Sequence, residues 1–334
     1  MSLPPIGPGL PWLAPLAGYS DLPFRLLCRE YGAACAVTEM VSAKGLVFHS
    51  HGTRDLLNTL PGDAPLVVQL FGCEPEMFER AMDHLLEHGY EYFDLNCGCS
   101  VPKVVKAGCG SALMREPALL REIVRVMAAK AGPGRAGVKL RLGWGEPEPL
   151  VFELARALED EGAGWLTLHP RHARQGYSGT AAWEHLARLK AQSRVPVMAS
   201  GDLFNAYDAR RCLDATGVDG VMFARGALYD PAVFRHFLSG TLAAPSGPEI
   251  ARLVRRHAEL IRVHGRPEKS LLRMRSIVPR YVRGLLGARA LRQEASSCTS
   301  WERLEEIVEA IAASASAPGG LHGAHIREEW DGRS

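Results

Sequence analysis

The stretch NCGCSVPK at 96–103 carries the most reactive side chains of this sequence. Cys97 and Cys99 flank Gly98, so both thiols fall on a segment whose backbone is adaptable. A thiol on such a loop can act as a nucleophile, a metal ligand or a general acid, and it can also be a small packing residue. Cys97, Cys99 and Cys109 lack a common zinc spacing, so we expect no metal site. No Cys/His signature supports a nucleophile.

Polar side chains also stand at the ends of short apolar runs throughout residues 12–240. One such residue is usually a core polar group with satisfied hydrogen bonds. Seven of eight runs end this way, which indicates a site that encloses a polar ligand. In chain order these side chains are Glu39, Gln69, Asn96, Lys139 with Arg141, His169, Ser200 with Asp202, and Arg225.

The last two run ends have the composition of a phosphate site. Ser200-Gly201-Asp202 and Ala224-Arg225-Gly226 combine small residues, which let backbone N–H groups approach a ligand, with a nearby arginine. Two ordinary turns rich in glycine are the alternative. We predict a phosphorylated ligand or cofactor.

Lys139 lies in the middle of a predicted strand and needs an anionic partner, because an unpaired buried lysine is costly. The N1–C2=O edge of a flavin becomes negative on reduction and would supply that partner. Gln69 could contact the other edge of the same ring.

The elements that position these residues alternate regularly. Apolar runs of strand length occupy 12–17, 35–40, 66–71, 92–96, 137–142, 165–169, 195–200 and 220–224. Helical patterns follow at 21–31, 75–88, 117–130, 148–162, 182–190, 204–215 and 231–238, while 42–63 reads as a loop with helical pieces. This order predicts an α/β fold, a (β/α)₈ TIM barrel. A doubly wound sheet is disfavoured, because no GxGxxG turn follows the first run.

A smaller all-helical domain is predicted after the barrel, with helices at 249–264, 268–286 and 300–313. The predicted domains are therefore 1–245, 246–313 and a flexible tail over 314–334. Residues 250–292 hold 12 Lys and Arg but only two acids, and this excess of positive charge predicts contact with a nucleic acid. A solvated helical face is the alternative.

The overall composition narrows the class of protein. The 334 residues are 47% hydrophobic and 23% charged, which is typical of a globular protein and excludes global disorder. No apolar run has the ~18 residues of a membrane span, and the N-terminus lacks the basic segment of a secretory signal. We expect a cytoplasmic protein with reduced cysteines and, by default, a monomer.

Several of these segments together resemble the tRNA-dihydrouridine synthases, most closely the bacterial B-type branch. The matching segments run in family order over about 230 residues. They are APLAGYSDLPFR at 14–25, TEM at 38–40, VQLFG at 68–72, DLNCGCSVPKVVKAGCGSALM at 94–114, VKLRLGW at 138–144, LTLHPRHARQGYSG at 166–179, VMASGD at 197–202 and MFARGAL at 222–228.

The resemblance implies reduction of the C5–C6 double bond of a specific uridine in tRNA, with FMN as cofactor and NADPH as reductant. Cys99 matches the catalytic acid that protonates C5. The FMN-binding positions match Pro15, Leu16, Ala17, Gln69, Lys139, His169, Ser200, Gly201, Asp202, Ala224 and Arg225. Asn96 matches the position that holds the uracil, Arg141, Arg174 and Tyr177 fall in segments on the substrate side, and the helical domain would hold the tRNA.

The sequence departs from the family pattern at Pro170, which removes a backbone donor from the turn after His169. Two other functions stay open at this point. One is an FMN barrel that reduces a free pyrimidine or an enone, and the basic domain argues against it. The other is a catalytically inactive RNA-binding protein, against which Cys99, Lys139 and Arg225 argue. Which uridine would be modified does not follow from the sequence.

Overall fold

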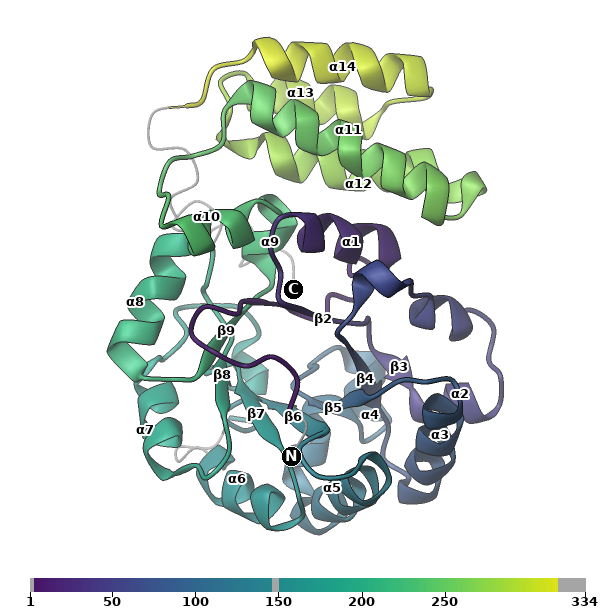
Figure 1. Cartoon of the computed structure of the whole chain (residues 1–334), viewed down its shortest axis with the longest axis vertical. Helices are drawn as coiled ribbons and strands as arrows, with labels where there is room; N and C mark the ends of the chain where they lie inside the picture. The colour runs from purple at the N-terminus through teal and green to yellow at the C-terminus, as the bar shows by residue number, and fades with distance from the viewer. Residues whose placement is uncertain (1–2, 146–149, 318–334) are drawn as a thin grey trace.

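The computed structural model describes residues 3–145 and 150–317, and its centre is a closed barrel of parallel strands (Figure 1). The barrel strands are β1 (Trp12–Leu13), β2 (Cys35–Val37), β4 (Leu66–Phe71), β5 (Tyr92–Cys97), β6 (Ala136–Leu140), β7 (Trp165–Leu168), β8 (Val197–Ala199) and β9 (Gly220–Phe223). Each pairs in parallel with its neighbours, and the β1–β9 and β2–β4 pairings close the ring. The short β3 (Val41–Ser42) extends the sheet beside β4. The predicted TIM barrel is confirmed.

Large side chains fill the lower barrel interior and require glycine opposite them. The rings of Trp12 and Trp165 meet edge to face, with centroids 5.9 Å apart. A Cβ on Gly137 would lie 2.0 Å from the Trp165 ring, so only glycine leaves room for this indole. The interior is therefore a packed core, and any ligand must bind at one of its ends.

Helices cover the outside of the barrel. They are α1 (Leu22–Glu30), α3 (Pro75–Glu87), α5 (Pro117–Ala131), α6 (Val151–Asp160), α7 (Glu184–Gln192), α8 (Ala206–Thr216) and α10 (Val233–Ser239). The short helices α2 (Ala43–Val47), α4 (Pro102–Lys106) and α9 (Arg225–Tyr229) lie in the connections. Pro75 and Pro117 each begin a helix, where a missing N–H costs nothing. The predicted start of α6 at 148 lies outside the described residues.

The C-terminal part of the chain is a layer of helices stacked on α1 and α9 (Figure 1). It contains α11 (Gly247–His264), α12 (Ser270–Tyr281), α13 (Ala288–Ser296) and α14 (Trp301–Ala313). The capping box of Ser246 and Glu249 starts α11. Helix α13 was not predicted from the sequence. Its Ala, Leu, Arg and Gln residues favour a helix, but it directly follows a stretch assigned to the preceding helix.

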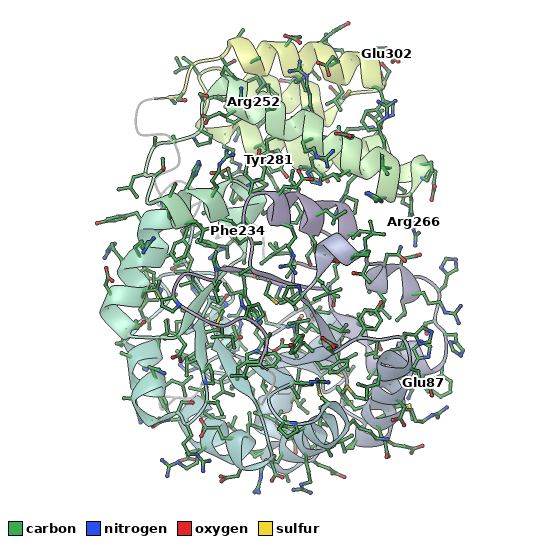
Figure 2. All side chains as sticks on the ribbon, in the orientation of Figure 1. Glu87, Phe234, Arg252, Arg266, Tyr281 and Glu302 are labelled. Carbon is green, nitrogen blue, oxygen red and sulfur yellow. The ribbon has the colours of Figure 1, made fainter. Side chains whose placement is uncertain are left out.

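A buried polar pair lies where this layer meets the barrel. The Tyr281 hydroxyl is 2.9 Å from Nδ1 of His257, and the His257 ring packs against Phe24 of α1, with centroids 5.7 Å apart. Tyr281 is visible at this boundary in Figure 2. Burial lowers the pKa of His257 to about 3, so the ring is neutral and suits an apolar interface.

The end of the described chain is anchored. Residues 314–317 begin the segment predicted to be a flexible tail. Here Ser316 pairs with Leu285, and the Ala317 N–H bonds to the Gly284 carbonyl. Residues 1–2 and the rest of the predicted tail, 318–334, lie outside the described residues. Within 3–145 and 150–317, no helix is long and apolar enough to cross a membrane.

Candidate active site at the carboxyl end of the barrel

A pocket of about 490 Å³, partly open to solvent, lies at the carboxyl ends of the barrel strands. It is lined mainly by residues that follow β1, β7, β8 and β9. Nine of the eleven predicted cofactor residues line it: Pro15, Leu16, Lys139, His169, Ser200, Gly201, Asp202, Ala224 and Arg225. The other two lie outside this lining, since Ala17 is exposed and Gln69 is fully buried. The topology thus brings together residues that are far apart in the sequence.

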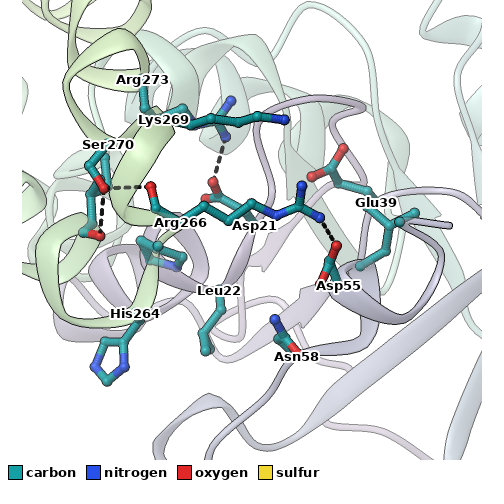
Figure 3. Close-up of a pocket in the computed structure, with 15 residues that line it drawn as sticks. Asp21, Leu22, Glu39, Asp55, Asn58, His264, Arg266, Lys269, Ser270 and Arg273 are labelled. Atoms are coloured by element: carbon teal, nitrogen blue, oxygen red, sulfur yellow. Dashed lines mark hydrogen bonds and ion pairs between the residues drawn. The ribbon is translucent and has the colours of Figure 1, made fainter.

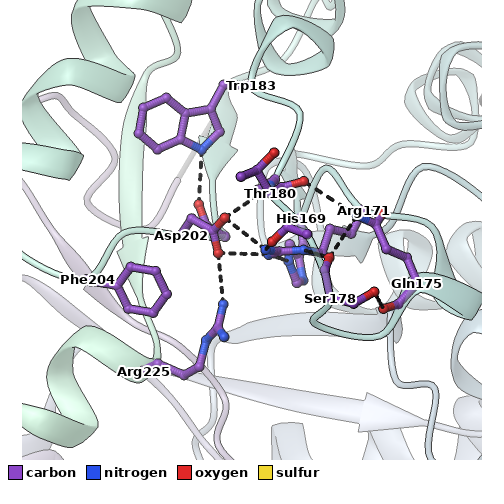
Figure 4. A network of polar contacts seen from close by, with 12 residues as sticks. His169, Arg171, Gln175, Ser178, Thr180, Trp183, Asp202, Phe204 and Arg225 are labelled. Carbon is purple, nitrogen blue, oxygen red and sulfur yellow. Dashed lines mark hydrogen bonds and ion pairs between the residues drawn. The ribbon is translucent and has the colours of Figure 1, made fainter. Parts of the chain in front are cut away.

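Asp202 is the centre of a polar network in this pocket (Figure 4). Arg171 forms a two-pronged ion pair with it, both N–O distances being 2.8 Å, and Arg225 donates from Nη2 at 2.9 Å. The Ala181 N–H completes the set. A carboxylate would repel a phosphate directly. Asp202 therefore serves the pocket by holding two guanidinium groups in place.

Arg171, which is fully buried, was not predicted from the sequence as a site residue. The signal available was an arginine two residues after His169, at the end of the strand next to the one that leads to Asp202. The turn that contains Pro170 therefore contributes to the polar network of the pocket through the side chain of Arg171.

The same network fixes the protonation of His169. Nη1 of Arg171 lies 3.2 Å from Nε2 of this ring, and a guanidinium can only donate, so Nε2 must accept. Burial, reinforced by the charges of Arg141, Lys139 and Arg171, holds the pKa of His169 well below its ordinary value. His169 is therefore neutral, with its proton on Nδ1.

The backbone at Gly201 makes room for a ligand. Its φ of +105° disfavours any other residue, and a Cβ there would lie 2.5 Å from the His169 ring. Arg225 is 8% exposed and packs between Phe204 and Tyr177, each ring centroid 4.7 Å away. Only Nη2 of its guanidinium has a hydrogen-bond partner among the described residues, so its other N–H groups can donate to a ligand. Small residues, a positive-φ glycine and a preoriented arginine fit a phosphate.

Lys139 lies in the upper barrel interior, on the floor of the pocket. Burial and the neighbouring Arg141 lower the pKa of Lys139 to about 8, while Asp94 and Cys99 act in the opposite direction. An anion bound beside Lys139 would stabilise the charged form of its side chain.

The side-chain amides of Gln69 and Asn96 form a chain of hydrogen bonds from the barrel interior to the cysteine loop, residues 97–101. Nε2 of Gln69 donates to Asp94 at 2.6 Å, and Nδ2 of Asn96 donates to Oε1 of Gln69 at 2.8 Å. Oδ1 of Asn96 accepts the N–H groups of Gly98 and Cys99, at 3.2 and 2.9 Å. Asn96 thus holds the backbone of the loop, and its second Nδ2 proton remains for a ligand.

The two cysteines of the loop have different environments. Cys97 is the last residue of β5 and lies in the apolar layer between strands and helices, where burial raises the pKa of its thiol far above the ordinary value. Cys99 is partly exposed and lies near Lys139. Of these two thiols, Cys99 is therefore the one available for chemistry. Among the described residues, no group of three or more His, Cys, Asp or Glu has the geometry of a metal site.

Arg141, Arg174 and Tyr177 are predicted to line the substrate side. The buried Arg141 bonds the carbonyl groups of Gly98, His172 and Gly176, so it ties the cysteine loop to the loop after β7. Arg174 and Tyr177 are exposed on that second loop. Their contact with a substrate stays a prediction.

A second pocket lies between the barrel and the helical layer (Figure 3). Arg273 reaches across it to Asp21 at 2.8 Å, and Arg266 pairs with Asp55. Lys269 and His264 share the lining. Partners from the barrel thus neutralise part of the basic segment, which the sequence analysis did not anticipate.

The fold is shared with solved structures of other proteins. A solved structure titled "Morphinone reductase" superposes with a TM-score of 0.54 at 15% identity, covering 76% of this chain and 90% of that one. A second, "Structure of morphinone reductase in complex with tetrahydroNAD", gives 0.51 at 14%, covering 72% and 89%. At such identities the likeness concerns the fold alone.

Sequence comparison identifies the family. The family model described as "Dihydrouridine synthase (Dus)" matches residues 12–316, and the chain belongs to this family. "Probable tRNA-dihydrouridine synthase 1" of Synechocystis is 35% identical over 303 residues, 89% of this chain and 84% of that protein. "tRNA-dihydrouridine synthase B" of Pseudomonas aeruginosa is 34% identical over 288 residues, covering 84% and 86%. The resemblance stated from the sequence is confirmed.

Proposed function

We propose that this protein reduces the C5–C6 double bond of a uridine in tRNA to 5,6-dihydrouridine, with FMN as cofactor and NADPH as reductant. The observation that carries this proposal is a cationic, phosphate-compatible pocket next to a loop with an accessible thiol. Family membership and the names of the relatives support it.

FMN, when bound, would accept a hydride from NADPH and supply one to C6 of the uracil. Arg225 and the backbone at Ser200-Gly201 would hold its phosphate, with Arg171 adding positive potential. Lys139 would offset the negative charge of the ring, and this fits the cost that burial now imposes on its charged form. Gln69 is buried in a hydrogen-bonded chain, which makes it a support for the ring edge or for Asn96.

Cys99 would donate the proton. Addition of hydride at C6 builds negative charge at C5 and O4, so a positioned thiol that gives its proton to C5 lowers the barrier. Asn96 holds the backbone N–H of Cys99 and would hold the uracil with its free amide proton. A target nucleotide must leave its tRNA contacts to reach this pocket.

The tRNA would lie across the barrel mouth and the helical layer. Arg273 and Arg280 of α12 contact the Gly18 carbonyl and the Tyr19 hydroxyl, directly after the pocket residues Pro15 and Leu16. Basic side chains thus begin next to the reaction site, and a phosphate backbone could follow them away from it.

One experiment tests the proposal. The purified protein should be yellow, or become yellow with FMN, and should lose its absorbance near 450 nm when NADPH is added. Unmodified tRNA should then accelerate reoxidation and acquire dihydrouridine. A protein that cannot bind FMN would favour an RNA-binding function, whereas reoxidation by free uracil or an enone but not by tRNA would favour a small-molecule reductase.

A further inference from the structure

Asp94 is a buried carboxylate to which the proposed reaction assigns no role. It lies on β5, two residues before Asn96, and is 2% exposed. Phe93 and Leu95 belong to the outer apolar core, so strand alternation directs Asp94 and Asn96 into the barrel. Oδ1 of Asp94 has no hydrogen-bond partner among the described residues. Burying a carboxylate with one unsatisfied oxygen destabilises a fold, so packing alone does not account for this residue.

The carboxyl group of Asp94 determines which atoms donate and which accept along this chain of hydrogen bonds. Oδ2 of Asp94 accepts from Gln69 both when the carboxyl group is ionised and when it carries a proton on the unpartnered Oδ1, so Gln69 must present its NH₂ group to Asp94 and its carbonyl oxygen to Asn96. Asn96 must then present its own NH₂ group to Gln69. Its oxygen is left facing the loop, where the N–H groups of Gly98 and Cys99 need an acceptor.

The β-sheet register makes this chain rigid. Gln69 on β4 and Asp94 on β5 are direct cross-strand partners, and Asn96 lies opposite Lys139 on β6. Gln69, Asp94 and Asn96 are all buried, and the series of hydrogen bonds that joins them ends at the backbone of the loop that carries Cys99. An acceptor at the start of the chain therefore sets the orientation of two amides and the backbone at its end.

We propose that Asp94 is a positioning residue: by orienting Gln69 and, through it, Asn96, it holds the loop that carries Cys99 in its reactive place. The proposal rests on the proposed function for its catalytic consequence, but its structural part can be measured independently. The role belongs to the acceptor oxygen and not to the negative charge.

This distinction defines the variants. In Asp94→Asn the amide oxygen can still accept from Gln69, because the opposite orientation would turn the Asn96 NH₂ group toward two backbone N–H groups. Asp94→Leu fills a similar volume without an acceptor, and Asp94→Ala removes both. Gln69→Leu breaks the chain one link later and tests the same path should neither acceptor-free variant fold. Thr167→Val is the matched control, since Thr167 is a fully buried polar residue of the barrel with no part in the chain.

The primary measurement is hydrogen–deuterium exchange of the peptide covering 97–101 in protein without FMN or tRNA. We expect exchange roughly tenfold faster or more in Asp94→Leu and Asp94→Ala, because the two N–H groups lose their fixed acceptor. Asp94→Asn and Thr167→Val should exchange like the wild type. Unchanged exchange in the acceptor-free variants would overturn the proposal. So would an Asp94→Asn variant that exchanges as fast as they do, because the charge would then be the decisive property.

Turnover supplies the second readout. The acceptor-free variants should lose on the order of tenfold to a hundredfold in kcat with little change in the KM for tRNA, since a reacting group is misplaced and the tRNA surface is not. Asp94→Asn should restore most of kcat. A wild type that makes no dihydrouridine would refute the proposed function and leave the exchange comparison intact. Normal kcat in the acceptor-free variants would overturn the catalytic consequence of Asp94.

Discussion

Two cysteines separated by one residue show how position decides chemistry at the scale of a side chain. Cys97 still belongs to β5 and packs against the surrounding helices, whereas Cys99 lies beyond the strand on the loop held by Asn96. Both thiols have the same intrinsic reactivity. Burial raises the pKa of the Cys97 thiol and shields it from any ligand, whereas the Cys99 thiol is partly exposed and can reach a substrate.

Replacing Cys99 by Ala should leave a folded protein that binds FMN and is reduced by NADPH but makes little dihydrouridine. The loss of a general acid is expected to slow turnover by roughly 10²–10⁴-fold. Single-turnover formation of dihydrouridine measures this step. Cys97→Ala is the control, with normal chemistry and a modest loss of stability. Near-normal turnover in Cys99→Ala would refute its role as proton donor.

Replacing Arg225 by Ala should weaken FMN binding by about 1.5–3 kcal/mol, because a charge-assisted hydrogen bond to the phosphate is lost. Titration of FMN into the apoprotein measures the affinity. Arg210→Ala is a matched control, since Arg210 bonds the Phe237 carbonyl on the outside of the barrel. Equal FMN affinity in the Arg225 variant would contradict the phosphate placement.

Asp94 also predicts a pH dependence of stability. Burial raises the pKa of Asp94 from 3.8 to about 7, against the opposing effects of Gln69 and Lys139. The folded protein binds this proton more tightly than the unfolded chain, so the associated stability is present below pH 4 and is lost as the pH rises to about 7. Asp94→Asn lacks this loss.

The free energy of unfolding of Asp94→Asn should therefore rise relative to wild type by about 2–3 kcal/mol between pH 5 and 7.5, which is the upper part of a total change of about 4 kcal/mol that begins near pH 4. Lys139 faces Asp94 from β6, and its pKa of about 8 keeps it charged over most of this range. Denaturant unfolding of the apoproteins at several pH values measures the difference, and Thr167→Val should show no such trend. A constant difference would mean that Asp94 does not titrate in this range.

At the scale of elements, the site depends on a barrel that closes tightly below it. β6 can pass beside Trp165 only because Gly137 has no side chain, and Gly137 is also the cross-strand partner of Asp94. The packing of the barrel interior and the alignment of the polar residues above it are therefore linked through the same strands.

Gly137→Ala should destabilise the protein by about 1–3 kcal/mol or more, because the added methyl group overlaps the indole. Thermal unfolding of the apoprotein measures this. Gly9→Ala is the control, since a Cβ at Gly9 meets nothing within 4 Å. An unchanged midpoint for Gly137→Ala would show that Trp165 can move, and the rigidity assigned to the barrel interior would be wrong.

At the scale of the whole molecule, the basic helical layer docks on the barrel and, under the proposed function, also holds the tRNA. Arg273 and Arg280 bind the loop before α1, and Arg256 pairs with Glu30 of α1, so these cations dock the layer on the barrel. Other cations of the layer, among them the exposed Lys269 beside the interdomain pocket, can serve the tRNA. Reversing Arg273 and Arg280 would therefore disturb docking as well as tRNA binding.

The Lys269→Glu variant tests tRNA binding without disturbing the docking of the helical layer on the barrel. We expect a higher apparent KM for tRNA. The slope of log affinity for tRNA against log salt concentration should become shallower by about one unit per lost phosphate contact. Oxidation of NADPH without tRNA should be unchanged, because that chemistry belongs to the barrel mouth. Arg252→Glu is the control, since Arg252 lies in the N-terminal half of α11, whereas Lys269 follows the C-terminal end of that helix; Figure 2 labels Arg252. If Lys269→Glu keeps the wild-type affinity and salt dependence, the tRNA must bind to another surface of the protein.

Local sequence patterns were enough to predict the eight barrel strands, the helices around them and most of the residues that line the pocket. Strands buried on both faces read as continuous apolar runs, and the barrel topology places every strand end at one rim, so polar residues at those ends could be assigned to one site. The family motifs added the expected roles of Cys99 and Asn96. These properties depend on local pattern and on one rule of topology.

The pairing of the polar groups becomes visible in the folded chain. That Asp202 holds Arg171 and Arg225, and that Asp94 orients Gln69, depends on strand register and on side-chain directions. The partners of the basic segment on α1 and in the barrel loops were equally hidden, because opposite charges more than 200 residues apart leave no local pattern. Hydrogen bonds and ion pairs are short-ranged and directional, so they become definite only when the chain has folded.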